Sequence, residues 1–553
     1  MFTTIRTFLD RVIHGTMASP DKIIHRVKVL NLPPKDTVPI KKLFNSHGIL
    51  KYKKAPQWNY AYINFDSEIA AKDTMATLSG MVFKKRTLAT EYAQISELAF
   101  RERFSPPPAP QETFDPRSFA ERLADQVTPL YKMPYEEQLA KKQKQAIRQL
   151  RNFRKKLVPL AELTPERKAQ LAWIYENTED PPCQILDPIR SPQIEGYRTK
   201  CEFSIGKDPT GQPTVGFLEG LYRDGMTHVL DPSQSIHVPT VSKQIAKAME
   251  QYVRHHSTWP VYDRRSKSGV WRSLMVKAQH TGDVLNTFSL PLKKKVMVLI
   301  QMKTSDLSTL QIEQEKQRLV EYWSSFAPKI KTLMVQQWNG DSNGVREGGT
   351  EVVMGDGYVY EHLLGHRFRI SSHAFFQVNT PATEHMLQTC AEWCHQEEEK
   401  KTTLLDLCCG CGSIGITMAN TVDRVVGIEM IPDAINDAKF NASLNQITNA
   451  QYHVGKVEEK IDVMSHERNE TVVAVLDPPR SGVHSSVIRA VREASHINKV
   501  IFISCDAKQA MQNFIRPTSK KYQGVPFKPK RAVTIDLFPH TDHAELMIEF
   551  VRI

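Results

Sequence analysis

Hydrophobic and polar positions in the first hundred residues follow two different periods. Four segments alternate in the manner of half-buried strands, and they are residues 25–32, 49–55, 59–65 and 86–93. Two others repeat apolar residues at helical spacing, and they are residues 38–48 and 68–80. Strand, helix, strand, strand, helix, strand is the order of a split βαβ sheet. The pattern therefore predicts an N-terminal α+β domain over residues 23–97.

Residues 181–365 alternate short β-rich segments with helices. Residues 199–206, 215–220 and 295–302 are rich in β-branched and aromatic residues, whereas residues 306–325 have helical spacing. The pattern predicts a mixed α/β domain over residues 179–365. We expect this central domain to bind RNA, although periodicity alone assigns it no chemistry.

Short apolar runs in the C-terminal third each end in a polar or glycine-rich turn. They are residues 402–407, 424–428, 472–476, 499–504 and 546–551. The first run leads into Cys408-Cys409-Gly410-Cys411-Gly412 and a helical pattern, a strand–turn–helix unit of the kind that holds a nucleotide. The alternation predicts an α/β, Rossmann-like domain over residues 366–553.

Polar groups at these strand ends are candidates for a binding site. Glu429 lies nineteen residues after Gly410, at a strand end where a carboxylate can accept hydrogen bonds from ribose hydroxyls. These features alone fit NAD as well as S-adenosylmethionine. Three later strand boundaries carry Asp477-Pro478-Pro479-Arg480, Ser504-Cys505-Asp506, and Phe538 to Glu545 before the last strand.

Five motifs over residues 180–553 resemble those of the RNA (uracil-5-)-methyltransferase family. They are Phe375-Phe376-Gln377-Val378-Asn379, the turn from Asp406 to Gly412, Asp477-Pro478-Pro479-Arg480, Ser504-Cys505, and the Phe-Pro-x-Thr-x-His-x-Glu stretch ending at Glu545. The resemblance implies a class I methyltransferase domain that uses S-adenosyl-L-methionine and needs no metal. It assigns cofactor binding to Gln377, Asp406, Cys408, Gly410, Gly412, Glu429 and Asp477. Relatives often have Tyr at the position of Cys408, so we expect a backbone contact there.

The resemblance also implies a route to 5-methyluridine, in the T loop of tRNA. Uracil C5 is a poor nucleophile until a thiolate adds to C6. Cys505 is the implied nucleophile and Glu545 the base that removes the C5 proton, while Arg480 and Asp477 would orient the uracil. Glu545 and Glu549 share one face of the last strand, and a solvent-facing pair is the alternative for them.

The strand from Trp58 to Phe65 resembles the RNP1 segment of an RNA-recognition motif, with Val27–Leu32 in the place of RNP2. Tyr60 and Tyr62 would be the rings that stack on bases. The segment lacks the basic residue and glycine that usually begin RNP1, and Lys28 stands where an aromatic ring normally stacks. The alternative is that the aromatic residues only alternate across a half-buried strand.

Positive charge is confined to the N-terminal part of the chain. Residues 1–170 hold 30 Lys and Arg against 17 Asp and Glu, so the remainder of the +12 chain is nearly neutral. A one-sided basic region suits a polyanion, and a solvated basic surface is the alternative. Residues 98–178 are predicted to form a linker and basic helical region, in which Ser105–Pro110 is a stiff linker. Eight basic residues and no acid lie in 141–156, at spacing that fits a helix. This helix would either lie on phosphates or be a solvated helix that leads into the next domain.

The eight cysteines follow no paired Cys-x-x-Cys spacing, so neither a metal centre nor a disulfide framework is expected. No run approaches the ~18 apolar residues of a spanning helix, and a membrane partner is not expected. These features favour a monomer in the cytoplasm or nucleus, and the resemblance implies tRNA as its partner. Residues 1–22 form an N-terminal extension. Its first twenty residues, with Arg6 and Arg11 against Asp10, also fit a weak mitochondrial presequence. The alternative that we favour is an irregular N-terminus with Met17 as a second possible start.

Three other functions compete with this interpretation. An adenine-N6 or cytosine-N4 methyltransferase would follow Asp-Pro-Pro with an aromatic residue, whereas this chain has Arg480. An RNA-binding or RNA-folding protein could keep the fold without the reaction, which the presence of Cys505 and Glu545 disfavours. Uracil in rRNA is chemically the same substrate, but relatives that act on rRNA often carry an iron–sulfur cysteine set.

Overall fold

The computed structural model describes most of the chain, which forms two compact units, residues 1–108 and 109–553. The described residues are 23–34, 37–49, 52–55, 57–84, 86–96, 116–161, 164–176, 181–220, 227–280, 295–325, 330–340, 344, 348–394, 401–461, 470–479, 482–505, 513–519 and 522–553. The predicted N-terminal extension and the Ser105–Pro110 linker lie outside them.

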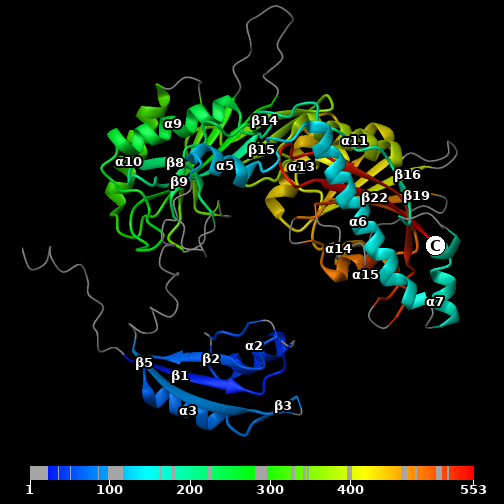
Figure 1. The fold of residues 1–553 in the computed structure, drawn as a ribbon, viewed down its shortest axis with the longest axis horizontal. Coiled ribbons are helices and arrows are strands. Elements are labelled where there is room, and N and C mark those ends of the chain that lie inside the picture. The colour runs from blue at the N-terminus through cyan, green and yellow to red at the C-terminus, as the bar shows by residue number, and fades with distance from the viewer. Residues whose placement is uncertain are drawn as a thin grey trace, which may run out of the picture. The chain divides into compact units, whose positions relative to one another are not determined.

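Unit 1, drawn in blue in Figure 1, is a sheet covered by two helices. Its main strands, in the order β2-β1-β5, are antiparallel neighbours. They are β1 (Ile23–Leu30), β2 (Ala61–Phe65) and β5 (Ala89–Ser96), with helices α2 (Thr37–Ser46) and α3 (Glu68–Leu78) and a small hairpin of β3 (Val82–Phe83) and β4 (Arg86–Thr87). The strand predicted at 49–55 is a single bridge between Lys53 and Tyr62, beside β2.

Unit 2 contains two large sheets, and the first has seven strands in the order β13-β12-β11-β10-β7-β8-β9. The strands are β7 (Lys200–Lys207), β8 (Pro213–Leu218), β9 (Val229–Leu230), β10 (Trp271–Ala278), β11 (Val296–Met302), β12 (Ile330–Gln337) and β13 (Thr350–Gly355). Helices α9 (Thr240–His255) and α10 (Thr309–Ser324) pack into one core on one face of the sheet. The mixed α/β pattern predicted for the central region is present.

The second sheet has eight strands in the order β18-β17-β16-β19-β20-β22-β21-β6. The first five are parallel neighbours, and β22 runs antiparallel to β20 and β21. They are β6 (Gln184–Ile185), β16 (Thr402–Leu407), β17 (Arg424–Glu429), β18 (Ala450–Val454), β19 (Thr471–Leu476), β20 (Ile497–Ser504), β21 (Phe527–Ile535) and β22 (Glu545–Arg552). Chain order reverses beside β16, the switch point where parallel α/β sheets bind ligands.

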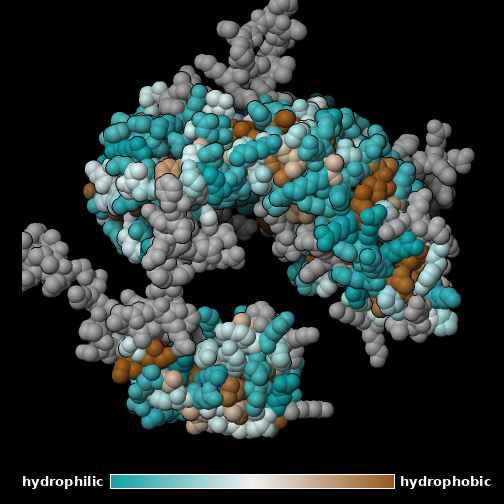
Figure 2. Space-filling view, in the orientation of Figure 1, coloured by the Kyte–Doolittle hydropathy of each residue, from teal (hydrophilic) through white to brown (hydrophobic). Residues whose placement is uncertain are grey.

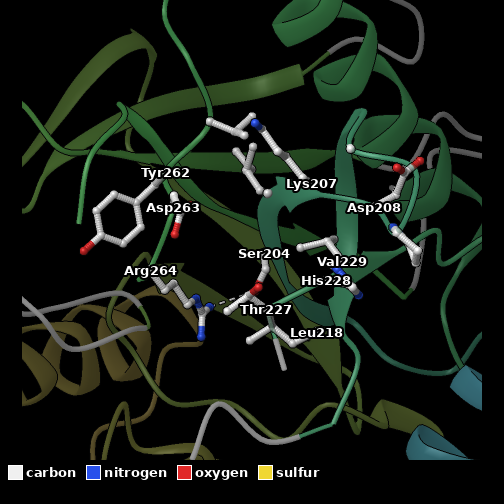
Figure 3. A pocket seen from close by; sticks show the side chains of 15 residues that line it. Ser204, Lys207, Asp208, Leu218, Thr227, His228, Val229, Tyr262, Asp263 and Arg264 are labelled. Carbon is white, nitrogen blue, oxygen red and sulfur yellow. Dashed lines mark hydrogen bonds between the residues drawn. The ribbon is translucent and has the colours of Figure 1, made fainter. Parts of the chain in front are cut away.

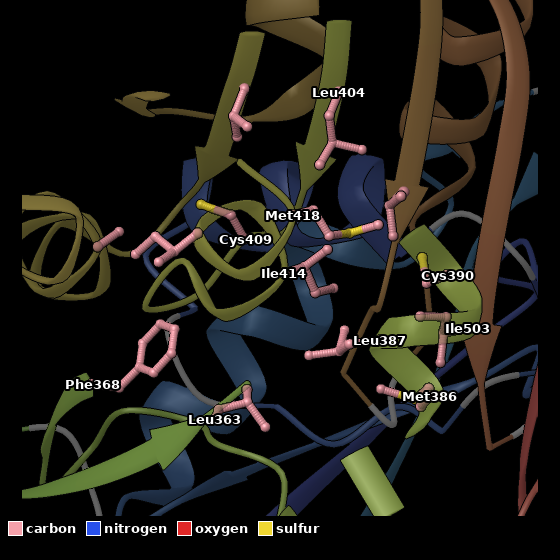
Figure 4. Close-up of a cluster of buried hydrophobic side chains, with 14 of the residues drawn as sticks. Leu363, Phe368, Met386, Leu387, Cys390, Leu404, Cys409, Ile414, Met418 and Ile503 are labelled. Atoms are coloured by element: carbon pink, nitrogen blue, oxygen red, sulfur yellow. The ribbon is translucent and has the colours of Figure 1, made fainter. Parts of the chain in front are cut away.

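Helices cover both faces of this sheet because alternate strand residues face opposite sides. Leu405 and Leu407 belong to the core with α15 (Ser485–Glu493), whereas Leu404 belongs to the core with α11 (Thr380–Cys394) and α13 (Pro432–Leu444). Figure 4 shows Leu404 of the second core near Met418 and Ile414 of α12 (Ser413–Met418). The shorter elements are η2 (Ala419–Thr421) and α14 (Val457–Lys460).

The two sheets of unit 2 share one hydrophobic core. Met275, Leu299 and Met334 of the seven-stranded sheet belong to the cluster that also contains α11 and α12. Between them lies the hairpin of β14 (Tyr358–Leu363) and β15 (His366–Ser371), which contributes Leu363 and Phe368. The predicted boundary between the central and C-terminal domains, at residue 365, falls in the turn of this hairpin. Because the hairpin packs into the shared core, the boundary stays a prediction.

The basic segment 141–156 lies in the long helix α6 (Tyr135–Ala161), which contacts α7 (Pro165–Gln170). The other short helices of this region are α5 (Phe119–Val127), which contacts β9, and α8 (Trp173–Glu176). One face of α6, with Ala146, Leu150, Phe153 and Leu157, packs into the core of the eight-stranded sheet. The opposite face carries exposed basic residues, so both sequence alternatives, a helix on phosphates and a solvated helix, stay open for that face.

The visible surface of unit 2 is mostly hydrophilic, with small hydrophobic patches (Figure 2). Within the part of the chain that the structure describes, every helix is too short or too polar to cross a membrane.

Candidate active site

The turn between β16 and α12 is built on left-handed backbone conformations. Cys408, Gly410 and Gly412 have φ angles of 73°, 53° and 83°. An added Cβ at Gly410 would meet no atom within 4 Å, whereas at Gly412 it would lie 3.0 Å from the Tyr452 hydroxyl. Gly412 is therefore required for packing, and Gly410 borders open space. Burial raises the pKa of the Cys408 thiol to about 12, so this side chain stays neutral.

Asp406 and Glu429 flank this turn from neighbouring parallel strands. Asp406 is fully buried; its Oδ2 accepts a hydrogen bond from the Gly415 amide at 3.0 Å, and its Oδ1 has no partner among the described residues. Burial, reinforced by the charges of Asp477 and Glu429, raises the pKa of Asp406 to about 7. Glu429 accepts from the amides of Gly410, Met430 and Ile431 at 3.3, 2.7 and 3.0 Å.

Gln377 and Asp477 meet although they lie a hundred residues apart. The Gln377 amide donates to Asp477 Oδ2 at 3.1 Å. Burial raises the pKa of Asp477 to about 6, and this hydrogen bond opposes the rise. Asp477 follows β19 directly, so Gln377 is held at the edge where β16 and β19 end. The structure thus brings together two residues that the sequence assigned to the cofactor.

Cys505 and Glu545 come to the same edge through antiparallel pairing. Ser504, the last residue of β20, pairs with Leu546, the second residue of β22. Cys505 directly follows Ser504 and Glu545 directly precedes Leu546, so both flank the last pair of this ladder. Cys505 is exposed and Glu545 is buried. An accessible thiol and a buried carboxyl therefore lie at the same end of the sheet.

The solvent-facing alternative for Glu545 and Glu549 is wrong. Glu549 is fully buried and forms ion pairs with Lys499, at 3.1 Å, and Arg531. A third cation, Lys530, lies 3.8 Å from the same carboxylate. Cations compensate the burial of Glu549, which makes it a structural residue of the sheet. Glu545, four residues earlier, is the first residue of β22 and lies at the other end of the strand.

Asn379 is a residue that the sequence interpretation quoted in a motif without giving it a role. Its buried side chain donates to Ser191 Oγ at 3.0 Å and to the Leu537 carbonyl at 3.2 Å. Asn379 therefore links the segment that carries Gln377 to the loop before Glu545. Its place two residues after Gln377 in the same motif was the available signal.

The remaining predicted residues lie elsewhere. Tyr60 and Tyr62 are in unit 1, where their ring centroids are 5.4 Å apart; the Lys28 ammonium lies 5.2 Å from the Tyr60 ring and Arg26 lies 4.6 Å from Tyr62. They form a half-exposed aromatic and basic surface. Arg480 lies outside the described residues.

A cavity of about 200 Å³ opens on the seven-stranded sheet (Figure 3). Lys207, His228 and Arg264 line it with Asp208 and Asp263, and Arg264 donates to Ser204 at 3.2 Å. None of the predicted site residues lies in this cavity.

The end of the sheet thus combines a glycine turn at the switch point, acidic groups beside it, and an exposed thiol and a buried carboxyl that flank the last β20–β22 pair. This arrangement defines a nucleotide-cofactor enzyme of the α/β class.

A family model described as tRNA (Uracil-5-)-methyltransferase matches residues 292–552. Human tRNA (uracil-5-)-methyltransferase homolog A is 33% identical over 507 residues, 89% of this chain and 76% of that protein. Human homolog B is 33% identical over 450 residues, 79% of this chain and 84% of homolog B.

The chain belongs to the tRNA (uracil-5-)-methyltransferase family, as its five motifs predicted. The fold is similar to the crystal structure of Pyrococcus abyssi tRNA (uracil-54, C5)-methyltransferase in complex with S-adenosyl-L-homocysteine. The TM-score is 0.52 at 19% identity, over 85% of this chain and 91% of that chain. The mixed α/β fold is therefore confirmed.

Proposed function

We propose that this protein transfers a methyl group from S-adenosyl-L-methionine to carbon 5 of a uridine in the T loop of tRNA. The observation that carries the proposal is the β20–β22 register, whose last pair, Ser504 with Leu546, is flanked by Cys505 and Glu545 at the end of the sheet that holds the glycine turn. Family membership supports tRNA as the substrate. The T loop is suggested by the Pyrococcus relative, which acts on uracil 54.

The residues at the switch point fit the cofactor. Open space at Gly410, the unpartnered Oδ1 of buried Asp406 and the Glu429 carboxylate together offer a backbone cradle with acceptors for hydroxyl groups. Gln377 and Asp477 would close its other side, since they already hold each other in place. When bound, the cofactor supplies an electrophilic methyl group on a sulfonium.

Cys505 provides the nucleophile. Its thiolate adds to uracil C6, which forms a carbon–sulfur bond and moves electron density to C5. C5 then takes the methyl group as the methyl–sulfonium bond breaks, and the electron pair of that bond stays on sulfur, so S-adenosyl-L-homocysteine is released. The exposed position of Cys505 lets a base that has left its stack reach the sulfur.

Glu545 completes the reaction as the base. It removes the proton from C5, the electron pair re-forms the C5–C6 double bond, and the Cys505 sulfur leaves C6. Burial of Glu545 keeps competing water away from the carboxyl. Asp477 and Arg480 would orient the uracil ring beside these two residues.

Two surfaces support RNA binding in this proposal. Unit 1 has the strand order and the exposed aromatic pair of an RNA-recognition motif, with Lys28 and Arg26 beside the rings. In unit 2, Lys144, Arg148, Arg151 and Lys155 lie on the exposed face of α6.

The test is methylation by the purified full-length protein, with labelled S-adenosyl-L-methionine, of unmodified tRNA and of an rRNA fragment. Nucleoside mass spectrometry should find 5-methyluridine in tRNA only, and a uridine-to-cytidine change in the T loop should remove it. Methylation of another nucleoside, or of rRNA in preference to tRNA, would contradict the proposal.

A further inference from the structure

The loop that leads into Glu545 is fastened to helix α6, almost four hundred residues earlier in the chain. This loop, residues 536–544, joins β21 to β22, and its two flanking residues, Ile535 and Glu545, pair with each other. Any movement of the loop therefore moves the strand end that carries Glu545. The contacts that hold it should affect the position of that carboxyl.

Lys142 of α6 makes the first set of contacts with this loop. Its side chain is completely buried, and its Nζ lies 2.7 Å from Asp536 Oδ1, also completely buried, and donates to the Phe538 carbonyl at 3.0 Å. The same Asp536 oxygen accepts from the Phe538 amide at 3.1 Å. The Lys142 ammonium thus contacts both residues that form the first turn of the loop, Asp536 and Phe538. Burial lowers the pKa of Lys142, and the Asp536 charge opposes this shift. Each buried charge is therefore compensated by the other, and removing one would leave the other unpaired.

Gln138, one turn earlier on the same helix face, makes the second set of contacts, with His540 of the loop. Its buried Oε1 accepts from the His540 amide at 2.8 Å, and its Nε2 lies 3.1 Å from His540 Nδ1. The His540 carbonyl accepts from the Leu130 amide at 2.9 Å. His540 has a φ of 66°, a left-handed conformation that a non-glycine residue holds only when its surroundings fix it.

We propose that Gln138 and Lys142 are positioning residues for the methylation reaction, which hold the 536–544 loop so that Glu545 faces the substrate carbon opposite Cys505. The inference rests on the proposed function. These two residues form a clasp on the loop that leads into Glu545, whereas Cys505 follows a different strand, β20. Loss of the clasp should therefore slow proton removal and release of the Cys505 sulfur more than it slows formation of the adduct.

The experiment follows single-turnover methylation of tRNA by the full-length protein, with the covalent adduct quantified on denaturing gels over time. Lys142→Met should form adduct at a rate close to wild type and resolve it about 10- to 100-fold more slowly, the scale of an ångström-sized misplacement. The kcat should fall with little change in the KM for tRNA. Gln138→Leu should act in the same direction and serves if Lys142→Met does not fold.

Two controls separate positioning from stability. The double variant Lys142→Met with Asp536→Leu replaces the buried ion pair by apolar groups, which should restore thermal stability while adduct resolution stays slow. Lys316→Met removes another buried lysine, paired with Glu313 and Glu351 on the other sheet of unit 2. It should lower stability and leave adduct resolution unchanged.

The outcomes are distinct. Resolution that recovers together with stability in the double variant, or that slows equally in Lys316→Met, would overturn the clasp and leave the proposed function standing. A wild-type protein that does not methylate uridine would refute the proposed function and the clasp with it.

Discussion

The buried carboxyl of Asp406 should make the stability of unit 2 depend on pH, and Asp406→Asn should remove that dependence. The folded-state pKa of about 7 lies above the ordinary value of 3.8. A carboxyl whose pKa is raised by folding stabilises the fold below its unfolded pKa and loses that contribution as pH rises through the folded value. The affected window is therefore about pH 4 to pH 7.

The size of the effect follows from the shift of the Asp406 pKa. A difference of roughly 3 pKa units, at about 1.4 kcal/mol each, gives roughly 4 kcal/mol as an upper limit. In the variant, an amide NH₂ at the Oδ1 position would be buried without a partner, which costs about 1 to 3 kcal/mol. That cost is the same at every pH, so the slope of the stability difference carries the information.

The assay is urea unfolding of the cofactor-free full-length protein at several pH values, compared between wild type and Asp406→Asn so that unit 1 contributes equally to both. The free energy of unfolding of the variant minus that of wild type should increase by up to roughly 4 kcal/mol between pH 4 and pH 8. Asp477→Asn, the control, should show a smaller change that ends near pH 6, where Asp477 titrates. A difference that is constant across this range would refute the reasoning.

Four other outcomes are expected. Cys505→Ala should lower turnover more than about 1,000-fold while S-adenosylhomocysteine affinity, measured by calorimetry, stays unchanged; normal product formation would contradict its role. Glu545→Gln should accumulate an enzyme–RNA adduct on denaturing gels, and wild-type turnover without adduct would place the base elsewhere. Gly410→Ala should weaken cofactor binding through a methyl group in open space, whereas Gly427→Ala, whose Cβ would lie 2.4 Å from Tyr452, should mainly lower the unfolding temperature. Deleting residues 1–100 should weaken tRNA binding by about 1 kcal/mol and reduce its salt dependence; equal affinity and salt slope would exclude an RNA-binding role for unit 1.

Strands and motifs in the C-terminal third were predictable because they depend on local sequence. Short apolar runs such as Val472–Leu476 are buried on both faces, and their lengths match the strands within two residues at either end. The glycine turn was predictable for the same reason, since glycine adopts φ values of 53° and 83° without the steric cost that a side chain adds. In unit 1, by contrast, the strand predicted at 49–55 differs from the structure. Its described residues form one bridge, between Lys53 and Tyr62, and an alternating pattern does not show how many residues will pair.

The sequence did not indicate how the site is held together, because the supporting contacts join distant segments. Glu549 alternates with Glu545 as an exposed pair would, and only the folded sheet brings Lys499 and Arg531 to it. Likewise, Cys505 and Glu545 reach the same end of the sheet only through the register between β20 and β22, which no local pattern specifies.

Helix α6 shows why a charge run is a poor guide to position. Eight basic residues between 141 and 156 suggested a helix directed at phosphates, and five of them are exposed. Lys142 lies in the same run, yet it falls on the face with Ala146 and Leu150 and is buried against Asp536. The signal was present, because Gln138 and Lys142 are polar residues four apart on an otherwise apolar stripe, where burial without a partner is costly. A partner had to exist, but only the fold identifies it as the loop before Glu545, so the helix that presents positive charge to solvent also supports the proposed base.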